Sequence, residues 1–283
     1  MADFMGPAAL GMAAAAFWGS GDFLVNIVSR RVGTWTALFQ SHLIALILVG
    51  GAAAALGQIL PVASPTAWTI VAVGAVLNLV MIASLYRALE LGPLPVVAPI
   101  VSSYAGIAAL LSFMSGIDTV SAARGACLAA IFAGVVLTAI EKDGGQARPR
   151  SGVGWALLCA GAGGANAWLQ GFVIVPAIGA FWTLIVDAAV VTLVAGAVGG
   201  FLASRTARPT PATLALGVCI AAGFLSYFLG LETGALIIVN VLSSMCAAVT
   251  ALLGAWLLGH RIARLQWAGV GVILAGVVAL NLV

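Results

Sequence analysis

The sequence predicts an all-α membrane protein with ten transmembrane helices, arranged as two five-helix repeats of opposite orientation. Composition gives the first reason. The 283-residue chain is 63% hydrophobic and only 7% charged, whereas soluble domains carry about 25% charged residues. Its mean hydropathy is +1.21. A soluble fold cannot bury this much apolar surface, so we expect a polytopic helical protein in a lipid bilayer.

The second reason is the spacing of the apolar segments. Clusters of Arg, Pro or Gly divide the chain into ten candidate helices, each near the roughly 20 residues that a hydrocarbon core requires. Most connections are short, so neighbouring helices should run antiparallel. The expected helices cover approximately 6–28, 34–57, 66–89, 93–115, 120–140, 152–174, 179–203, 211–231, 234–258 and 263–282.

The third reason is internal repetition. Ala-Leu-Glu-Leu-Gly-Pro-Leu at 88–94 returns as Gly-Leu-Glu-Thr-Gly-Ala-Leu at 230–236, and Ala-Gly-Val-Val at 133–136 returns at 275–278. Both pairs lie 142 residues apart, which is half of the chain. Five predicted helices in each half force the second copy to enter the membrane from the opposite side. Inverted repeats of this kind are typical of secondary transporters, with the substrate site at the repeat interface.

The repeats define the predicted organisation of the chain. Residues 1–140 form the first five-helix repeat, residues 141–151 form a polar linker, and residues 152–283 form the second, inverted repeat. Because one chain already holds both halves, a monomer is sufficient.

The basic residues predict the orientation of the bundle. All of the 11 Lys and Arg residues except Arg124 end or follow an odd-numbered predicted helix. The positive-inside rule makes that side cytoplasmic, which places both termini outside. The expected location is a bacterial cytoplasmic (inner) membrane.

Three features resemble the drug/metabolite transporter superfamily, specifically its ten-span EamA-type members. These are the five-plus-five repeat, Phe-Trp-Gly-Ser at 17–20, and the turns Gly-Ile-Asp at 116–118 and Gly-His-Arg at 259–261, each before an Ala-Gly-Val-Val. The Glu of the family's Gly-Glu turn is replaced by Asp118, shifted by one position, and by His260. The resemblance covers nearly the whole chain. It implies a transporter of small metabolites such as amino acids, quaternary amines or drugs, commonly directed outward.

Ionisable groups inside a span are costly and are therefore functional candidates. Asp22 is the strongest, because Trp18 and Asn26 stand four residues before and after it on the same helix face. An aromatic face beside a carboxylate suits a cationic or amino-group substrate. Two alternatives stay open. Asp22 could carry a coupling proton, or it could lie at the interface and pair with Arg30 or Arg31.

Two further ionisable residues lie within predicted spans. Asp187 follows Trp182 in the seventh span, which should border the cavity of an inverted repeat, with a position near the membrane surface as the alternative. His42 in the second span is interpreted as a packing histidine bonded to a backbone carbonyl rather than as a proton relay. A single histidine of this kind gives no support to a metal site.

The predicted substrate site is a central cavity lined by the first, third, fourth, sixth, eighth and ninth helices. Tryptophans deep within spans are better candidates for it than those near span ends, which anchor at the membrane interface. The predicted set is Trp18, Ser20, Asp22, Asn26, Tyr86, Ser103, Tyr104, Trp168, Trp182, Asp187, Tyr227 and Asn240.

Two structural features accompany this site. Glu90 and Glu232 end the third and eighth helices at equivalent repeat positions. A carboxylate satisfies free N–H groups at a helix N-terminus, so each is expected to cap the helix that follows it, with gating as the alternative. Pro99 in the fourth span removes a backbone donor and predicts a kink.

The function expected from these observations is secondary transport, specifically export of small metabolites such as amino acids or organic amines. No phosphate-binding loop is present, so ATP does not drive transport directly, and no cofactor or nucleic acid is expected. The expected partners are the lipid bilayer and a small-molecule substrate, with proton coupling left open. An intramembrane enzyme and a non-transporting receptor or scaffold are the alternatives. The first would need a nucleophile with its base, and the second usually brings soluble domains.

Overall fold

The computed structural model describes residues 6–116, 121–139, 152–202, 208–258 and 264–280. Within these ranges every regular element is a helix. The predicted linker at 141–151 and the turn residues Asp118 and His260 lie outside the described residues.

The first half of the chain forms three long helices and three shorter ones. They are α1 (Pro7–Val32), α2 (Thr34–Ala55), α3 (Pro65–Leu91), α4 (Leu94–Ser102), α5 (Tyr104–Met114) and α6 (Ala122–Ala139). Together α4 and α5 occupy the predicted fourth helix, which is broken at Ser103. Pro99 lies inside α4, four residues before this break. Its missing N–H leaves a carbonyl of the first turn without an intrahelical partner, so the predicted kink takes the form of two separate helices.

The second half has interruptions at similar places. Its elements are α7 (Val153–Leu169), a π-helical turn η3 (Gln170–Ile174), α8 (Val175–Leu202), α9 (Pro211–Glu232), α10 (Leu236–Ser244), α11 (Cys246–Leu258) and α12 (Arg264–Leu280). Met245 separates α10 from α11, 142 residues after Ser103. Gly179 has φ 78° and interrupts α8, much as Gly33 with φ 81° separates α1 from α2.

The distribution of polar and apolar side chains is that of a protein in lipid. Ile47, Leu193 and Trp256 are among the large apolar side chains exposed on the outside, whereas Asp22 and Asp187 are buried. Six helical stretches of the described chain are long and apolar enough to cross a bilayer. The prediction of a polytopic, all-helical integral membrane protein is therefore confirmed. These stretches are Pro7–Val32, Thr34–Ala55, Pro65–Leu91, Val96–Met114, Val153–Gly199 and Pro211–Glu232.

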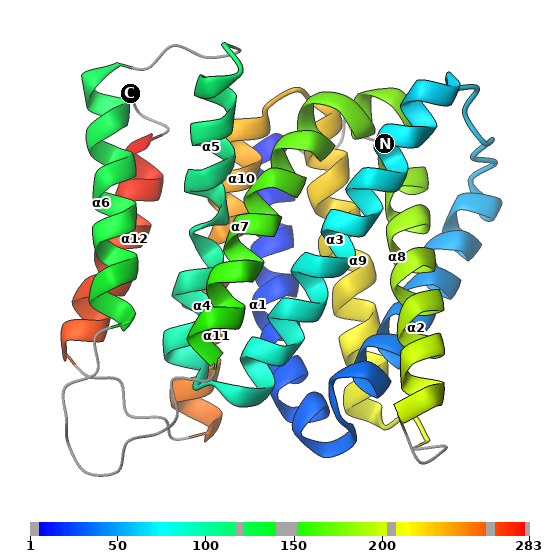
Figure 1. The fold of residues 1–283 in the computed structure, drawn as a ribbon, viewed down its shortest axis with the longest axis horizontal. Helices are drawn as coiled ribbons and strands as arrows, with labels where there is room; N and C mark the ends of the chain where they lie inside the picture. Colours follow the sequence, from blue (N-terminus) through cyan, green and yellow to red (C-terminus); the bar gives the residue numbers. More distant parts are fainter. Residues whose placement is uncertain (1–5, 117–120, 140–151, 203–207, 259–263, 281–283) are drawn as a thin grey trace.

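Helices from the two halves of the chain pack against each other across the bundle. In Figure 1, α6 and α12 stand side by side at one end, and α2 and α8 lie together at the other. Between them, α1 packs against α9 while α3 packs against α7, and α4 contacts α11. The centre of the bundle is thus built from α1, α3, α7, α9 and the interrupted helices. The beginning of α1 and the end of α12 lie at the same edge, the upper one in Figure 1.

Two glycines bring the central helices into close backbone contact. A Cβ atom on Gly19 of α1 would overlap the Val249 side chain of α11 and lie 2.8 Å from a carbonyl oxygen of that helix. A Cβ on Gly164 of α7 would lie 2.5 Å from Ile107 Cβ of α5 and 3.0 Å from a carbonyl oxygen there. Ile107 and Val249 are again 142 residues apart. Small residues of this kind let helices approach closely in lipid.

The carboxylates of Glu90 and Glu232 bind at helix N-termini, but not at those predicted. Thr34 Oγ1 at the start of α2 donates to Glu90 Oε2 at 2.5 Å. The backbone N–H of Ala180, directly after Gly179, donates to Glu232 Oε1 at 2.6 Å. The helices that follow the two glutamates, α4 and α10, begin without a side-chain cap. The expected cap of the following helix was wrong, because side chains lean toward the N-terminus of their own helix and so reach back to a neighbour.

The close contact at Gly164 makes a stability prediction. Gly164→Ala should lower the free energy of unfolding by about 1–3 kcal/mol, because the added methyl group overpacks the contact with Ile107. Gly161→Ala is the matched control in the same helix, since a Cβ there meets nothing within 4 Å. Thermal unfolding of the purified protein in detergent compares the two variants. If the Gly164→Ala and Gly161→Ala variants are equally stable, the close contact between Gly164 and Ile107 is contradicted.

The cap at Glu232 makes a second prediction. Glu232→Ala removes the acceptor for the Ala180 N–H and should cost roughly 0.5–1 kcal/mol of unfolding free energy. Glu232→Gln keeps an acceptor oxygen and should retain most of the stability. The measurement is again thermal unfolding in detergent. If alanine and glutamine are equally tolerated, the hydrogen bond does not stabilise the helix start.

Candidate functional site

A cavity lies between the central helices of the bundle. Its volume is about 90 Å³, well above the roughly 10–15 Å³ that a cavity needs to hold one water. The lining residues come from α1, α3, α4, α5, α7, η3, α9 and α11, with His42 added from α2. These elements correspond to the six predicted helices that were expected to surround a cavity.

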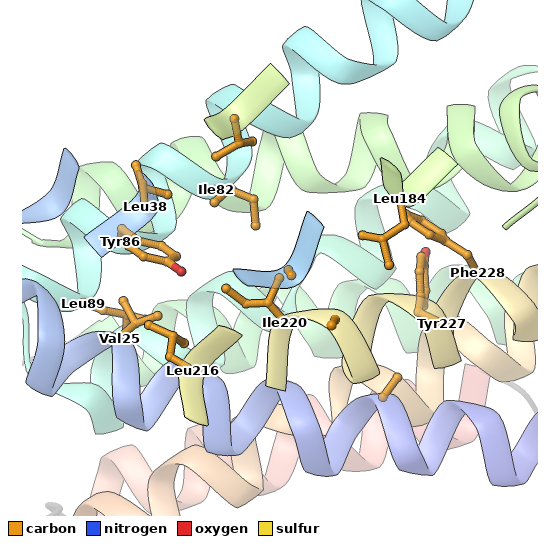
Figure 2. Packing of buried hydrophobic residues seen from close by; sticks show 14 of the residues in the cluster. Val25, Leu38, Ile82, Tyr86, Leu89, Leu184, Leu216, Ile220, Tyr227 and Phe228 are labelled. Atoms are coloured by element: carbon orange, nitrogen blue, oxygen red, sulfur yellow. The ribbon is translucent and has the colours of Figure 1, made fainter. Parts of the chain in front are cut away.

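Aromatic rings form one side of the wall. The Trp18 ring centroid lies 4.9 Å from that of Phe224 and 5.0 Å from that of Tyr227. Gly223 leaves space for this indole, because a Cβ there would lie 2.6 Å from Trp18 Cδ1. Figure 2 shows Tyr227 beside Phe228 and Leu184 within the same buried cluster. The wall therefore offers π-faces to whatever enters.

Asp22 is the one carboxylate among the described residues of the wall, and no Lys or Arg accompanies it there. It is 8% exposed, and Thr250 Oγ1 lies 3.4 Å from its Oδ2. The alternative pairing with Arg30 is not found, since Arg30 Nη2 donates instead to the Gly92 carbonyl at 3.2 Å. No ion pair joins Asp22 to Arg31 among the described residues either. Asp22 thus presents a carboxyl group to the cavity with no cationic partner among the described residues.

Three tyrosines predicted for the site line the cavity as well, and each hydroxyl is held by a neighbour. Tyr86 Oη lies 2.8 Å from Ser41 Oγ on α2, and Tyr104 Oη lies 2.7 Å from Ser243 Oγ on α10. Tyr227 Oη donates to Asn240 Oδ1 at 2.5 Å. These bonds fix the rings in place. The predicted residues in the wall are Trp18, Asp22, Tyr86, Tyr104 and Tyr227.

The other seven predicted residues lie outside the wall. Asn240 supports Tyr227, Asn26 Nδ2 donates to the Leu89 carbonyl at 2.5 Å, and Ser103 Oγ donates to the Ile100 carbonyl at 2.7 Å. Ser20 is partly buried on α1.

The two predicted tryptophans of the second half and Asp187 are also placed away from the cavity. Trp182 Nε1 donates to the Ile59 carbonyl at 2.9 Å. The Trp168 ring packs against Phe172 at a centroid distance of 6.1 Å. Asp187 stands behind the wall and accepts a hydrogen bond from Gln170 Nε2 at 2.9 Å.

Several residues of the wall were not in the predicted set. Asn166 and Gln170, four residues apart on one helix face, line the cavity, and so do Phe224 and Phe228 with the same spacing. This spacing was visible in the sequence. His42 lies in the wall while its Nδ1 stays 3.1 Å from the Leu38 carbonyl, which agrees with the predicted packing role. Among the described residues, no three His, Cys, Asp or Glu side chains gather as a metal site.

Comparison with known proteins adds information on the fold only. No protein-family model matches the chain, and no curated protein matches it in sequence. A solved structure published only as "Crystal structure of protein" superposes with a TM-score of 0.70 at 16% sequence identity, over 98% of this chain and 96% of its own. The two proteins share an overall fold across nearly their whole lengths.

Proposed function

We propose that the protein is a secondary transporter that exports small organic amines or related metabolites by alternating access. The observation that carries this proposal is Asp22. It lies on an aromatic wall without a cationic partner among the described residues, inside a cavity that helices from both halves of the chain enclose. Such a wall attracts a cation through both its charge and its π-faces.

We further propose that the chain spans the membrane ten times as two inverted five-helix repeats. Each interrupted pair, α4 with α5 and α10 with α11, then counts as one span. Three recurrences support the repeat. They are the breaks at Ser103 and Met245, the glycine contacts with Ile107 and Val249, and the hydrogen bonds of Glu90 and Glu232 to residues at helix starts. Alternating access in such proteins is largely a movement of one repeat against the other around a fixed site.

The residues of the wall favour one of the substrate classes that the sequence left open. A zwitterionic amino acid needs a partner for its carboxylate, and no Lys or Arg lies in the described wall. An organic amine or quaternary ammonium ion needs only the anionic and aromatic groups that are present. Amines are therefore the favoured class, in keeping with the resemblance to EamA-type transporters.

The proposed orientation places both termini outside the cytoplasm. The ends of α1 and α3 and the beginnings of α9 and α12 lie at one edge of the bundle, the lower one in Figure 1. Arg30, Arg87 and Arg264 are at or near these helix ends. The positive-inside rule makes this edge cytoplasmic.

A topology experiment checks this orientation. An alkaline phosphatase domain fused after Val283 should be active, because it is exported, and a green fluorescent protein at the same place should stay dark. The same pair inserted within 144–147 should give the opposite result. Reversal at both positions would show that the basic residues do not set the orientation.

Substitution of Asp22 tests the transport site. In Asp22→Asn, flux of the permanent cation choline into proteoliposomes should fall at least tenfold, which is about 1.4 kcal/mol of lost stabilisation. Thr192→Val is the control, since it removes a buried hydroxyl that bonds the Ala188 carbonyl outside the cavity. Flux is measured at matched protein levels from pH 6 to 8. Unchanged flux and pH dependence in Asp22→Asn would exclude Asp22 as a cation or proton site.

A further inference from the structure

The α7 side of the cavity carries two buried amides that the proposed function has not yet used. Asn166 and Gln170 stand four residues apart on the same helix face, and both line the cavity. Only 4% of Asn166 and 1% of Gln170 is exposed. Polar groups are expensive to place here, because the membrane interior holds little water to bond them.

The nitrogen of each amide is already engaged. Gln170 Nε2 donates to Asp187 Oδ2 at 2.9 Å, and Asn166 Nδ2 lies 3.5 Å from Asn78 Oδ1. Through this hydrogen bond the nitrogen end of the Gln170 amide faces Asp187 on α8. Asp187 thus serves as a positioning residue that turns the Gln170 oxygen away from α8.

The oxygens of both amides are left without partners. Asn166 Oδ1 and Gln170 Oε1 have no hydrogen-bond partner among the described residues. A buried acceptor without a donor costs free energy, and such groups in a native structure call for an explanation. Both oxygens are enclosed by protein in this conformation. Their residues lie one helical turn apart in the lining of one cavity, which points to a ligand that supplies the donors when the amides turn toward it.

The local backbone is irregular at this point. Gln170 begins the π-helical turn η3, and π-helical turns inside α-helices occur frequently at functional sites. Gly171 lets Leu236 of α10 approach, because a Cβ at Gly171 would overlap that side chain. The irregular turn is therefore held by close packing, and with it the position of the Gln170 amide.

We propose that Asn166 Oδ1 and Gln170 Oε1 form a second subsite, which accepts hydrogen bonds from a donor group of the substrate. This inference rests on the proposed function, in which Asp22 receives the cationic group. Asp22 belongs to α1 and the amides to α7 and η3, so the substrate contacts both halves of the chain. The substrate class narrows to small organic cations that carry a second donor, such as a hydroxyl or an amide N–H.

A matched series of permanent cations tests the subsite in the intact purified protein. Choline is a small quaternary ammonium ion that carries one hydroxyl donor. Propyltrimethylammonium replaces the hydroxyl by a methyl group, and O-methylcholine keeps an acceptor but no donor. A second series carries the same hydroxyl, methyl and methoxy end groups on a linker one carbon longer, because the distance between Asp22 and the amide oxygens that a ligand must bridge is not fixed in advance. Dissociation constants come from calorimetry in detergent.

In at least one of the two series, the hydroxyl compound should bind about tenfold more tightly than the alkyl compound. The methyl ether should bind no more tightly than the alkyl compound. Asn166→Leu, which leaves the pair of Gln170 and Asp187 intact, should reduce the advantage. Gln170→Leu should do the same, and Thr192→Val should not. Thermal unfolding with and without choline verifies that each variant is folded.

The other outcomes overturn separate parts of the proposal. If all cations bind equally but Asp22→Asn weakens them, the amine transporter stands and the second subsite is wrong. If the methyl ether binds as well as the hydroxyl compound, the partner is a donor such as Trp18 Nε1, which is also buried and unpartnered, and the subsite is again wrong. If no cation binds, the proposed substrate class fails together with the subsite.

Discussion

The backbone contacts at Gly19 and Gly164 are the constraint on which the centre of this protein depends. Lipid provides no hydrophobic drive for helices to associate, so close packing must hold them together. Gly19 fixes α1 against α11, and Gly164 fixes α7 against α5. The neighbouring residues Trp18 and Gly163 then lie in the cavity wall. A larger residue at either glycine would push apart the helices that define the cavity.

With the helices fixed, hydrogen bonding decides which polar groups remain for a ligand. The hydroxyls of Tyr86, Tyr104 and Tyr227 are engaged with Ser41, Ser243 and Asn240. The tyrosines therefore offer mainly their rings to the cavity. What is left on the lining residues is the carboxyl group of Asp22, the amide oxygens of Asn166 and Gln170, and the indole N–H of Trp18. Under the proposed function, an aromatic wall with one carboxyl group and no Lys or Arg among its described residues favours cations over anions.

The sequence predicted the helices well because lipid imposes simple rules of length and polarity on them. It predicted a kink of the fourth helix from Pro99, where the structure has a break. Nothing local marks the matching break at Met245, which only the 142-residue offset indicates. Trp18 and Asp22 share the cavity face as expected. Asn26 does not share this face. Residues four apart on an α-helix differ by about 40° around the helix axis, so Asn26, two such steps after Trp18, faces α3 instead.

The breaks and the cavity meet at the same depth in the bundle. Tyr104 and Cys246 are the first residues after the two breaks, and both line the cavity. A ligand there contacts the points at which α4 joins α5 and α10 joins α11. A bound ligand shifts a conformational equilibrium only if it binds the two states differently. Residues beside a helix break move when the helix bends, so their contacts with a ligand differ between bent and straight forms. Under the proposed function, this coincidence gives a physical route from substrate binding to the movement of the two halves.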